Sequence, residues 1–379
     1  MSAHPTTAQP IPLAPVPEFE LPAGLSTPAI VVDEARLLAN IDRVQAEFDR
    51  RGIALRPHAK THKSIRIANL QLDAGARGIT VGTIGEAEVF LAGGINDLFL
   101  AYPVWAEGPR VERIRQLHDA APRFAIGVDS VAGAERLGAA VGGSRRPLRI
   151  LIEVDPGNRR TGVAGPQEAV DVALAARAAG LVVDGVFSHG GHGYAPGAGP
   201  GAGADEVRTL SDAAVALRDA GFEAPIVSAG STPTMTAAAG GLVNEVRPGT
   251  YVFGDRQQWL LGSIPGEGCA AVVAATVVSV RDGWLVVDAG AKALTKDRAD
   301  WLRGYGHLPR YPSLVIDRLA DYHGNIPTPH AAARPQLGEI VSIVPNHICP
   351  VVDLVDAFTV VRGDGSTEHW PVDARGRSG

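Results

Sequence analysis

Apolar and polar positions alternate in blocks along most of the chain. From Thr27 onward, the short apolar segment 29–33 predicts a strand, and residues 35–51 place their apolar side chains at helical spacing. The same two patterns follow directly, with a strand at 53–58 and a helix at 63–74. Repeated alternation of strands and helices is typical of an α/β fold with a parallel sheet.

Further strand candidates follow the first strand, and most of them precede a helix-like segment. They lie near residues 53–58, 79–83, 97–102, 124–128, 148–155, 182–188, 225–229 and 245–253. Together they predict a (β/α)8 TIM barrel over residues 25–260. A doubly wound open sheet would also accommodate these strands. We favour the barrel and assign strand 29–33 to a separate β domain.

Strand patterns of another kind fill residues 261–379. Beyond about residue 265 the helical spacing stops, and β-branched segments alternate with turn signals such as Arg281-Asp282-Gly283. These residues predict a C-terminal β domain. Residues 1–24 contain six prolines and predict an extended arm. The glycine-rich segment 190–205 has low complexity and is predicted to be a mobile active-site loop.

Composition narrows the possible functions. The formal net charge of −6 gives no electrostatic reason to bind a polyanion, so we expect no nucleic acid partner. The longest apolar runs fall short of the about 18 residues that a membrane-spanning helix needs, so we expect no membrane segment. The first residues lack a basic region and a continuous apolar run, which predicts no secretory signal and a cytoplasmic location. In a reducing compartment, no disulfide between Cys269 and Cys349 is expected.

A basic cluster stands where the second strand ends, in the sequence RPHAKTHK. Lys60 and His62 are two residues apart, which on an extended backbone would place both side chains on one face. A sheltered lysine at the catalytic end of a barrel strand could act as a Schiff-base nucleophile, and Lys60 and His62 are the expected catalytic residues. A solvated strand end is an equally good interpretation of these residues alone.

The segment SAGSTPT, residues 228–234, predicts a strand end that passes into the start of a helix. Backbone N–H groups at such a turn form an anion site, late in the barrel where this fold often binds phosphate. An ordinary helix cap at Ser231 or Thr232 would have a similar sequence.

The segment PNHICP in the β domain contains His347 and Cys349, which on a strand would share one face. Two soft ligands without further cysteines nearby predict a metal site with open positions, as in catalysis. A buried cysteine beside a hydrogen-bonded histidine is the alternative.

Taken together, seven ordered motifs between about Leu25 and Phe358 resemble the D-serine dehydratase and D-threonine aldolase family. The motifs are RPHAKTHKS, GNRRTGV, SHGGHGYA, SAGSTPT, NEVRPGTYVFGD, DAGAKAL and PNHICP. The resemblance implies an α/β protein of the alanine racemase type, with a barrel that binds pyridoxal 5'-phosphate, a β domain that holds a divalent metal, and a homodimer. It assigns Lys60 as the cofactor lysine and His347 and Cys349 as the metal pair. It places the remaining cofactor contacts at Arg160, Tyr194, Gly230, Ser231, Thr232, Gly249 and Thr250.

The resemblance leaves the reaction open within one substrate class, the D-3-hydroxy amino acids. No tyrosine motif matches the second base of alanine racemases, so racemisation is disfavoured. The His-x-Cys pair favours D-serine dehydratase-like elimination of water to a 2-oxo acid and ammonia. The residues after it, Pro350 to Leu354, look more like a D-threonine aldolase, which would release glycine and an aldehyde. A non-catalytic cofactor carrier is a further alternative. Zinc is the expected metal, with manganese or cobalt as alternatives.

Overall fold

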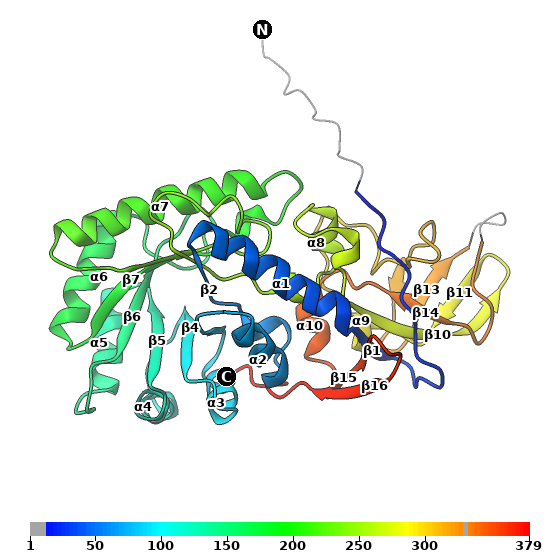
Figure 1. Ribbon diagram of the computed structural model, residues 1–379, viewed down its shortest axis with the longest axis horizontal. Helices are drawn as coiled ribbons and strands as arrows, with labels where there is room; N and C mark the ends of the chain where they lie inside the picture. Colours follow the sequence, from blue (N-terminus) through cyan, green and yellow to red (C-terminus); the bar gives the residue numbers. More distant parts are fainter. Residues whose placement is uncertain (1–12, 329–332) are drawn as a thin grey trace, which may run out of the picture.

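Two sheets organise the part of the chain that the computed structural model describes, residues 13–328 and 333–379 (Figure 1). The first sheet has eight parallel strands in the order β2-β9-β8-β7-β6-β5-β4-β3. The gap between β2 and β3 is closed by a parallel bridge from His58 to Thr80, whose backbone N–H donates to the Pro57 carbonyl. The predicted (β/α)8 barrel is therefore confirmed. Its strands are β2 (Ala54–Leu55), β3 (Ile79–Val81), β4 (Asp97–Pro103), β5 (Arg123–Val128), β6 (Arg149–Glu153), β7 (Val182–Phe187), β8 (Ile226–Ala229) and β9 (Glu245–Val246).

Amphipathic helices surround the barrel, and α1 (Glu34–Arg51) shows why they form. The Asp33 side chain caps this helix by accepting from the Arg36 backbone N–H, and Gly52 ends it in the left-handed conformation. Its apolar residues recur at helical spacing and are buried at Leu37, Ile41, Val44 and Phe48. The other barrel helices are α2 (Ile65–Asp73), α3 (Ile84–Ala92), α4 (Pro109–Ala120), α5 (Val131–Ala140), α6 (Pro166–Ala178) and α7 (Gly199–Asp219).

The second sheet holds the first strand of the chain as well as the C-terminal ones. β1 (Ala29–Asp33) pairs antiparallel with β10 (Ala271–Arg281) and parallel with β15 (Ala357–Val361). The register places Val31 opposite both Val272 and Thr359. The remaining strands of this sheet are β11 (Trp284–Val287), β12 (Arg318–Leu319), β13 (Gly324–Pro327), β14 (Ile340–Ile343) and β16 (Thr367–Pro371).

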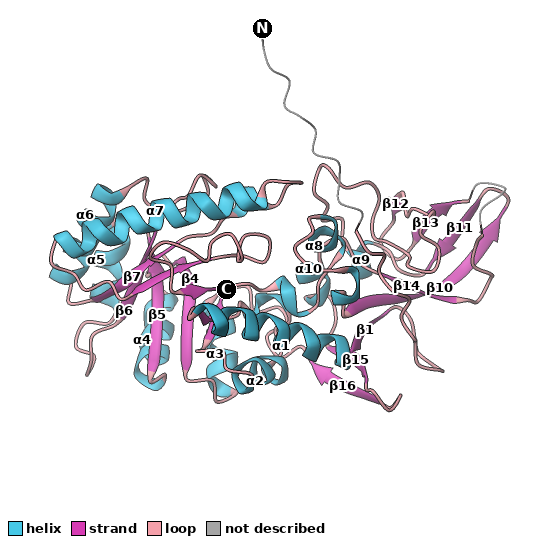
Figure 2. Cartoon of the chain, turned by 45° about the horizontal axis from the view of Figure 1, so that its top comes forward, coloured by secondary structure: helices cyan, strands magenta, loops and turns pink. Residues whose placement is uncertain are grey.

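Short helices lie between the barrel and the second sheet in both views (Figure 1, Figure 2). These are α8 (Arg256–Leu260) and α10 (Ile348–Val352), while α9 (Ala291–Leu294) follows β11. Along the described residues, no helix combines the length and the apolar character needed to cross a bilayer.

The glycine-rich segment 190–205 is only partly the loop that its composition suggested, because its second half is helical. Gly191–Gly193 form a 3-10 turn, and Gly199 begins α7. The small residues serve close packing: a Cβ at Gly199 would lie 2.6 Å from the Pro233 carbonyl oxygen. A Cβ at Gly203 would likewise lie 2.6 Å from the Cβ of Ala237. Glycine here lets α7 approach the segment after β8, and the low complexity reflects this contact.

Candidate functional site

A pocket opens at the carboxyl ends of the barrel strands, where this fold positions loop side chains around a ligand. Seven of the residues expected at the cofactor line it: Lys60, Arg160, Tyr194, Gly230, Ser231, Gly249 and Thr250. The other lining residues are His58, Thr61, Ala101, Tyr102, Phe187, His189 and Arg247. His62 and Thr232 are absent from the lining.

The lysine and the histidine of the basic cluster have separate places. Lys60 is in a 3-10 turn, Ala59–Thr61, that follows β2, so the expected extended face shared with His62 is wrong. His62 is fully buried, its Nδ1 accepts from the Ser64 backbone N–H over 3.1 Å, and its ring lies edge-on to Phe90. Burial lowers the pKa of His62 to about 4. The turn thus directs Lys60 into the pocket and His62 into the packing beside it.

The segment after β8 forms a series of turns, and the expected helix start is wrong. Two backbone N–H groups, those of Thr234 and Met235, donate to the Ser231 carbonyl at 2.9 and 2.7 Å. Gly230 has a φ of 72°, and a Cβ there would lie 2.9 Å from Val246. The Thr232 hydroxyl lies outside the pocket lining and accepts a hydrogen bond from the Tyr251 backbone N–H over 3.2 Å.

Gly249 and Thr250 provide backbone N–H donors for an anion at this end of the pocket. Within the described residues, neither backbone N–H donates a hydrogen bond to protein. Both residues line the pocket together with Ser231, whose hydroxyl is an additional donor. A Cβ at Gly249 would lie 2.8 Å from the Thr61 hydroxyl and 3.0 Å from the His58 carbonyl oxygen, so this approach needs glycine. The donors fit a phosphate group.

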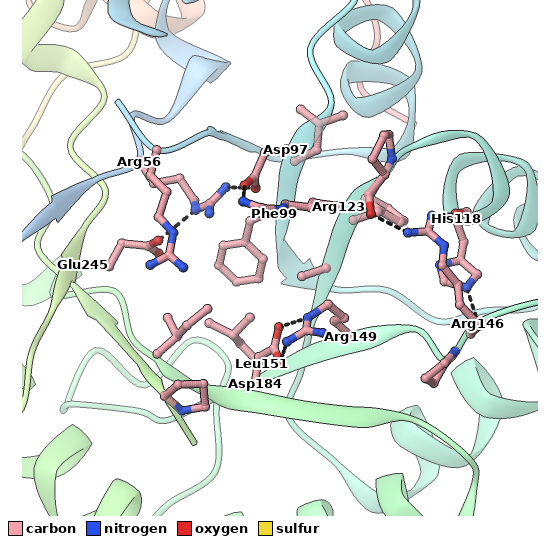
Figure 3. A pocket seen from close by; sticks show the side chains of 18 residues that line it. Arg56, Asp97, Phe99, His118, Arg123, Arg146, Arg149, Leu151, Asp184 and Glu245 are labelled. Carbon is pink, nitrogen blue, oxygen red and sulfur yellow. Dashed lines mark hydrogen bonds and ion pairs between the residues drawn. The ribbon is translucent and has the colours of Figure 1, made fainter. Parts of the chain in front are cut away.

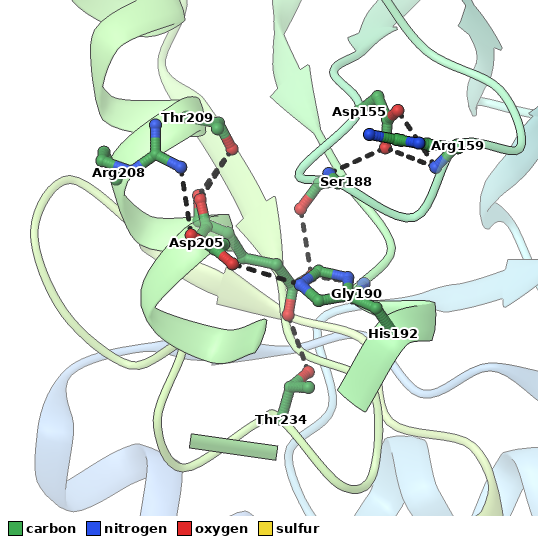
Figure 4. Close-up of polar contacts among 11 residues, drawn as sticks. Asp155, Arg159, Ser188, Gly190, His192, Asp205, Arg208, Thr209 and Thr234 are labelled. Atoms are coloured by element: carbon green, nitrogen blue, oxygen red, sulfur yellow. Dashed lines mark hydrogen bonds and ion pairs between the residues drawn. The ribbon is translucent and has the colours of Figure 1, made fainter. Parts of the chain in front are cut away.

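Glu206 of α7 holds this end of the pocket together and was not found from the sequence. Its buried carboxylate accepts from the Ser188 hydroxyl at 3.0 Å, the Thr234 hydroxyl at 2.7 Å and the Gly230 backbone N–H at 3.2 Å. Figure 4 shows Ser188, Gly190 and Thr234 converging on one side chain. Burial raises the pKa of Glu206, while these donors oppose that shift. One carboxylate thereby ties α7 to the loops after β7 and β8.

Two histidines and an arginine of the pocket were also missed. His58 and His189 have pKa values well below the ordinary range, because burial and the charge of Lys60 disfavour the protonated ring. Arg247 is buried, and its Nη1 donates to the Ser228 hydroxyl over 2.5 Å. Burial lowers the pKa of Arg247, with Glu245 opposing the shift. The sequence feature that could have identified Arg247 is its position directly after a buried strand.

The expected metal pair begins a helix and does not share a strand face. His347 is the residue before α10, and Cys349 is in its first turn. The reason is Asp255, whose buried carboxylate accepts from the Ile348 backbone N–H over 3.1 Å and so starts the helix. Asp297 Oδ2 lies 2.6 Å from His347 Nδ1, which leaves Nε2 as the free ring nitrogen.

The chemistry of this pair suits a divalent metal. Burial is the largest single influence on Cys349 and opposes ionisation, but His347, Lys60 and Thr61 together outweigh it and lower the pKa of the thiol. Among the described residues, no group of three or more His, Cys, Asp or Glu side chains is arranged to hold a metal ion. A metal at this point would have two protein ligands and open positions, as catalytic sites do.

One contact links the metal pair to the turn that carries Lys60, although neither His347 nor Cys349 is among the residues that line the pocket. Cys349 Sγ lies 3.3 Å from the hydroxyl of Thr61, the residue next to Lys60. Close by, buried Lys63 pairs with Asp353 at 2.7 Å and with Glu86 at 3.4 Å. These contacts fix α10 against the barrel.

Comparison with known proteins gives matches over most of the chain. Residues 32–257 match the family described as alanine racemase, N-terminal domain, and residues 270–361 match the putative serine dehydratase domain. The chain is 35% identical to the D-threo-3-hydroxyaspartate dehydratase of Delftia sp. (strain HT23), over 91% of this chain and 97% of the relative. It is 31% identical to the D-threonine aldolase of Arthrobacter sp, over 94% of each.

Solved structures give the same result. The Delftia dehydratase aligns with a TM-score of 0.85 at 34% identity, over 92% of this chain and 97% of that one. The D-threonine aldolase from Filomicrobium marinum aligns with a TM-score of 0.84 at 31% identity, over 93% of this chain and 95% of that one. With both parts matched in one order and over nearly full length, the chain belongs to the D-serine dehydratase and D-threonine aldolase family, which has a barrel of the alanine racemase type.

Proposed function

We propose that this chain eliminates water from a D-3-hydroxy amino acid to give a 2-oxo acid and ammonia, using a divalent metal at His347 and Cys349. Its family makes it a pyridoxal-phosphate-dependent lyase. The observation that carries the proposal is that the turn containing Lys60 lies next to the metal pair. The hydroxyl of Thr61, in this turn, is 3.3 Å from Cys349 Sγ.

The pocket residues divide the work of holding the cofactor. Lys60 would carry it through Nζ, and Ser231, Gly249 and Thr250 would bind its phosphate. When bound, pyridoxal phosphate supplies an electron sink that weakens the bonds at the substrate Cα. Once the substrate amine has replaced it on the cofactor, the free amine of Lys60 would be the group that takes the proton from Cα.

The metal pair would act on the other end of the substrate. His347 Nε2 and Cys349 Sγ would hold the ion, whose Lewis acidity favours departure of a β-hydroxyl. Zinc is the metal that such a pair favours. Solved forms of the Delftia dehydratase include a histidine-to-alanine variant and a metal-free cysteine-to-alanine variant. The neutral rings of His58 and His189, which line the same pocket as Lys60, would orient the substrate through hydrogen bonds.

Retro-aldol cleavage is the second candidate, favoured by the 31% identity to a D-threonine aldolase over nearly the whole chain. The same metal site would then acidify the β-hydroxyl and the bond between Cα and Cβ would break. The family also makes a homodimer the oligomer that we expect.

The test is to incubate the holoenzyme with D-serine, D-threonine, D-threo-3-hydroxyaspartate and D-alanine. We expect a 2-oxo acid and ammonia from a hydroxy substrate, with activity lost on chelation and restored by zinc, manganese or cobalt. Glycine with an aldehyde would identify an aldolase instead. Racemisation of D-alanine at a comparable rate, or no turnover of any substrate, would overturn both candidates.

The cofactor lysine has its own test. Borohydride reduction and peptide mapping should place the pyridoxyl group on Lys60, and Lys60→Ala should lose it. Lys296→Ala is the matched control, because this lysine is exposed and outside the pocket. A pyridoxyl group on Lys63 or Lys292 would contradict the assignment.

A further inference from the structure

A second and larger cavity lies at the opposite end of the barrel. Its volume is about 690 Å³, within the range of small-molecule pockets. Asp97, Arg123, Arg149 and Ile226 line it and are the first residues of β4, β5, β6 and β8. The cavity therefore opens at the amino ends of these strands (Figure 3), and its lining does not include Lys60.

Arginine dominates this cavity although the chain as a whole carries a net charge of −6. The lining contains five arginines, Arg56, Arg77, Arg123, Arg146 and Arg149, against three carboxylates, Asp97, Asp184 and Glu245. The local formal charge is therefore +2, from five minus three.

The three carboxylates are already committed to two of the arginines. Arg56 is buried and pairs with Asp97 at 2.6 Å and Glu245 at 2.9 Å. Arg149 pairs with Asp184 through two hydrogen bonds (Figure 3). These pairs neutralise the inner part of the cavity and leave the excess charge to the other arginines.

Arg146 is held in place without being neutralised. Its guanidinium donates to the backbone carbonyls of His118, Ala121 and Pro122. Carbonyl dipoles fix its direction but carry no net charge, so Arg146 still attracts an anion by its charge. Both hydrogens of its Nη2 are already donated, so paired hydrogen bonds to a ligand are left to the other arginines. Its geometry is set before any ligand arrives, which lowers the entropy cost of binding.

The last two arginines are exposed and weakly engaged. Arg77 is exposed, and its charge acts on the carboxylate of Asp184, which already pairs with Arg149. Arg123 is 73% exposed and reaches Asp97 only at 3.5 Å. Both can turn toward a ligand without breaking a contact on which the fold depends.

Apolar side chains form the rest of the surface between these cations. They are Leu98, Phe99, Pro122, Phe124, Ala125, Pro147, Leu151, Pro225 and Ile226. A purely inorganic anion would leave this surface without a partner, whereas an organic anion would cover it.

We propose that this cavity binds a small organic anion, with a carboxylate or phosphate group at Arg77, Arg123 and Arg146 and an apolar body against the strand ends. Planar guanidinium groups bind both anions through paired hydrogen bonds, so the two share one recognition chemistry.

Calorimetric titration of the holoenzyme tests the proposal, because the bound cofactor already occupies the other phosphate site. The probes are phenyl phosphate, benzoate, the neutral analogue benzamide, and inorganic phosphate. We expect saturable binding of at least one aromatic anion, with benzamide and inorganic phosphate at least about tenfold weaker. The stronger of the two aromatic anions identifies the preferred head group.

The double variant Arg77→Gln with Arg123→Gln should weaken that binding about tenfold or more and leave turnover unchanged. Arg281→Gln, an exposed arginine at the end of β10, is the matched control and should bind as the wild type does. No saturable binding of either aromatic anion, or undiminished binding by the double variant, would overturn the proposal. If benzamide bound as tightly as the aromatic anions, the proposed role of charge would be wrong. If inorganic phosphate bound as tightly as they do, the proposed role of the apolar surface would be wrong.

Discussion

Replacing His62 by glutamine separates a structural histidine from a catalytic one. His62 is fully buried, and burial lowers its pKa from 6.5 to about 4. The folded protein therefore resists protonation of this ring, whereas the unfolded chain accepts the proton near pH 6.5. Stability from this residue is present above pH 6.5 and is lost as the pH falls toward 4.

The size of the effect follows from the two pKa values. A shift of 2.5 units corresponds to at most about 3 kcal/mol, and between pH 7 and pH 5 the wild type should lose about 2 kcal/mol through this ring. His62→Gln removes the titrating group. Between pH 7 and pH 5, the unfolding free energy of the variant should therefore fall by about 2 kcal/mol less than that of the wild type. Its turnover number should remain within a few-fold of the wild type.

Urea denaturation of the holoenzyme at pH 7 and pH 5 measures the difference, and steady-state assays at pH 7 measure turnover. His323→Gln is the control, because this histidine is exposed and should keep the wild-type dependence on pH. A hundredfold loss of turnover by His62→Gln with an unaltered pH dependence of stability would refute the structural interpretation.

Three further substitutions test the supports of the site. Asp297→Asn should weaken metal affinity about 10- to 100-fold by releasing His347, measured by chelator competition with Asp300→Asn as control. Gly249→Ala should cost about 1–3 kcal/mol of cofactor affinity by overpacking, and unchanged affinity in a cofactor titration would contradict this. Lys63→Met should lower the unfolding free energy by about 3–5 kcal/mol, measured by urea denaturation, because buried Glu86 loses its partner. Adding Glu86→Gln should recover part of that loss, and no recovery would exclude this pair as the cause.

The sequence could reveal the barrel and much of its pocket, because both depend on local patterns. Each parallel strand is a short apolar segment, and residues directly after a strand end at the same face of the barrel. This is why Lys60 and Ser231 were expected at one end of the barrel, whereas Thr250 was expected only from the family resemblance; all three line one pocket.

Errors arose where a distant residue decides the local conformation. His347 and Cys349 suit a strand by spacing, but Asp255, 93 positions from Ile348, caps a helix there. Glu206 was missed for a similar reason, since it lies inside a helix and its donors come from loops elsewhere in the chain. No local pattern contains such contacts.

The contact between Thr61 and Cys349 has a consequence for how this kind of enzyme can change. In the proposed function, the barrel side of the contact would hold the substrate nitrogen, and the α10 side would face the β-hydroxyl oxygen, three bonds from that nitrogen. Under that proposal, substitutions within the few residues from His347 to Leu354 would change the outcome of the reaction, while Lys60 and the phosphate-binding residues would stay the same. A contact surface between two parts that vary independently would allow a dehydratase and an aldolase to descend from one ancestor with the same fold.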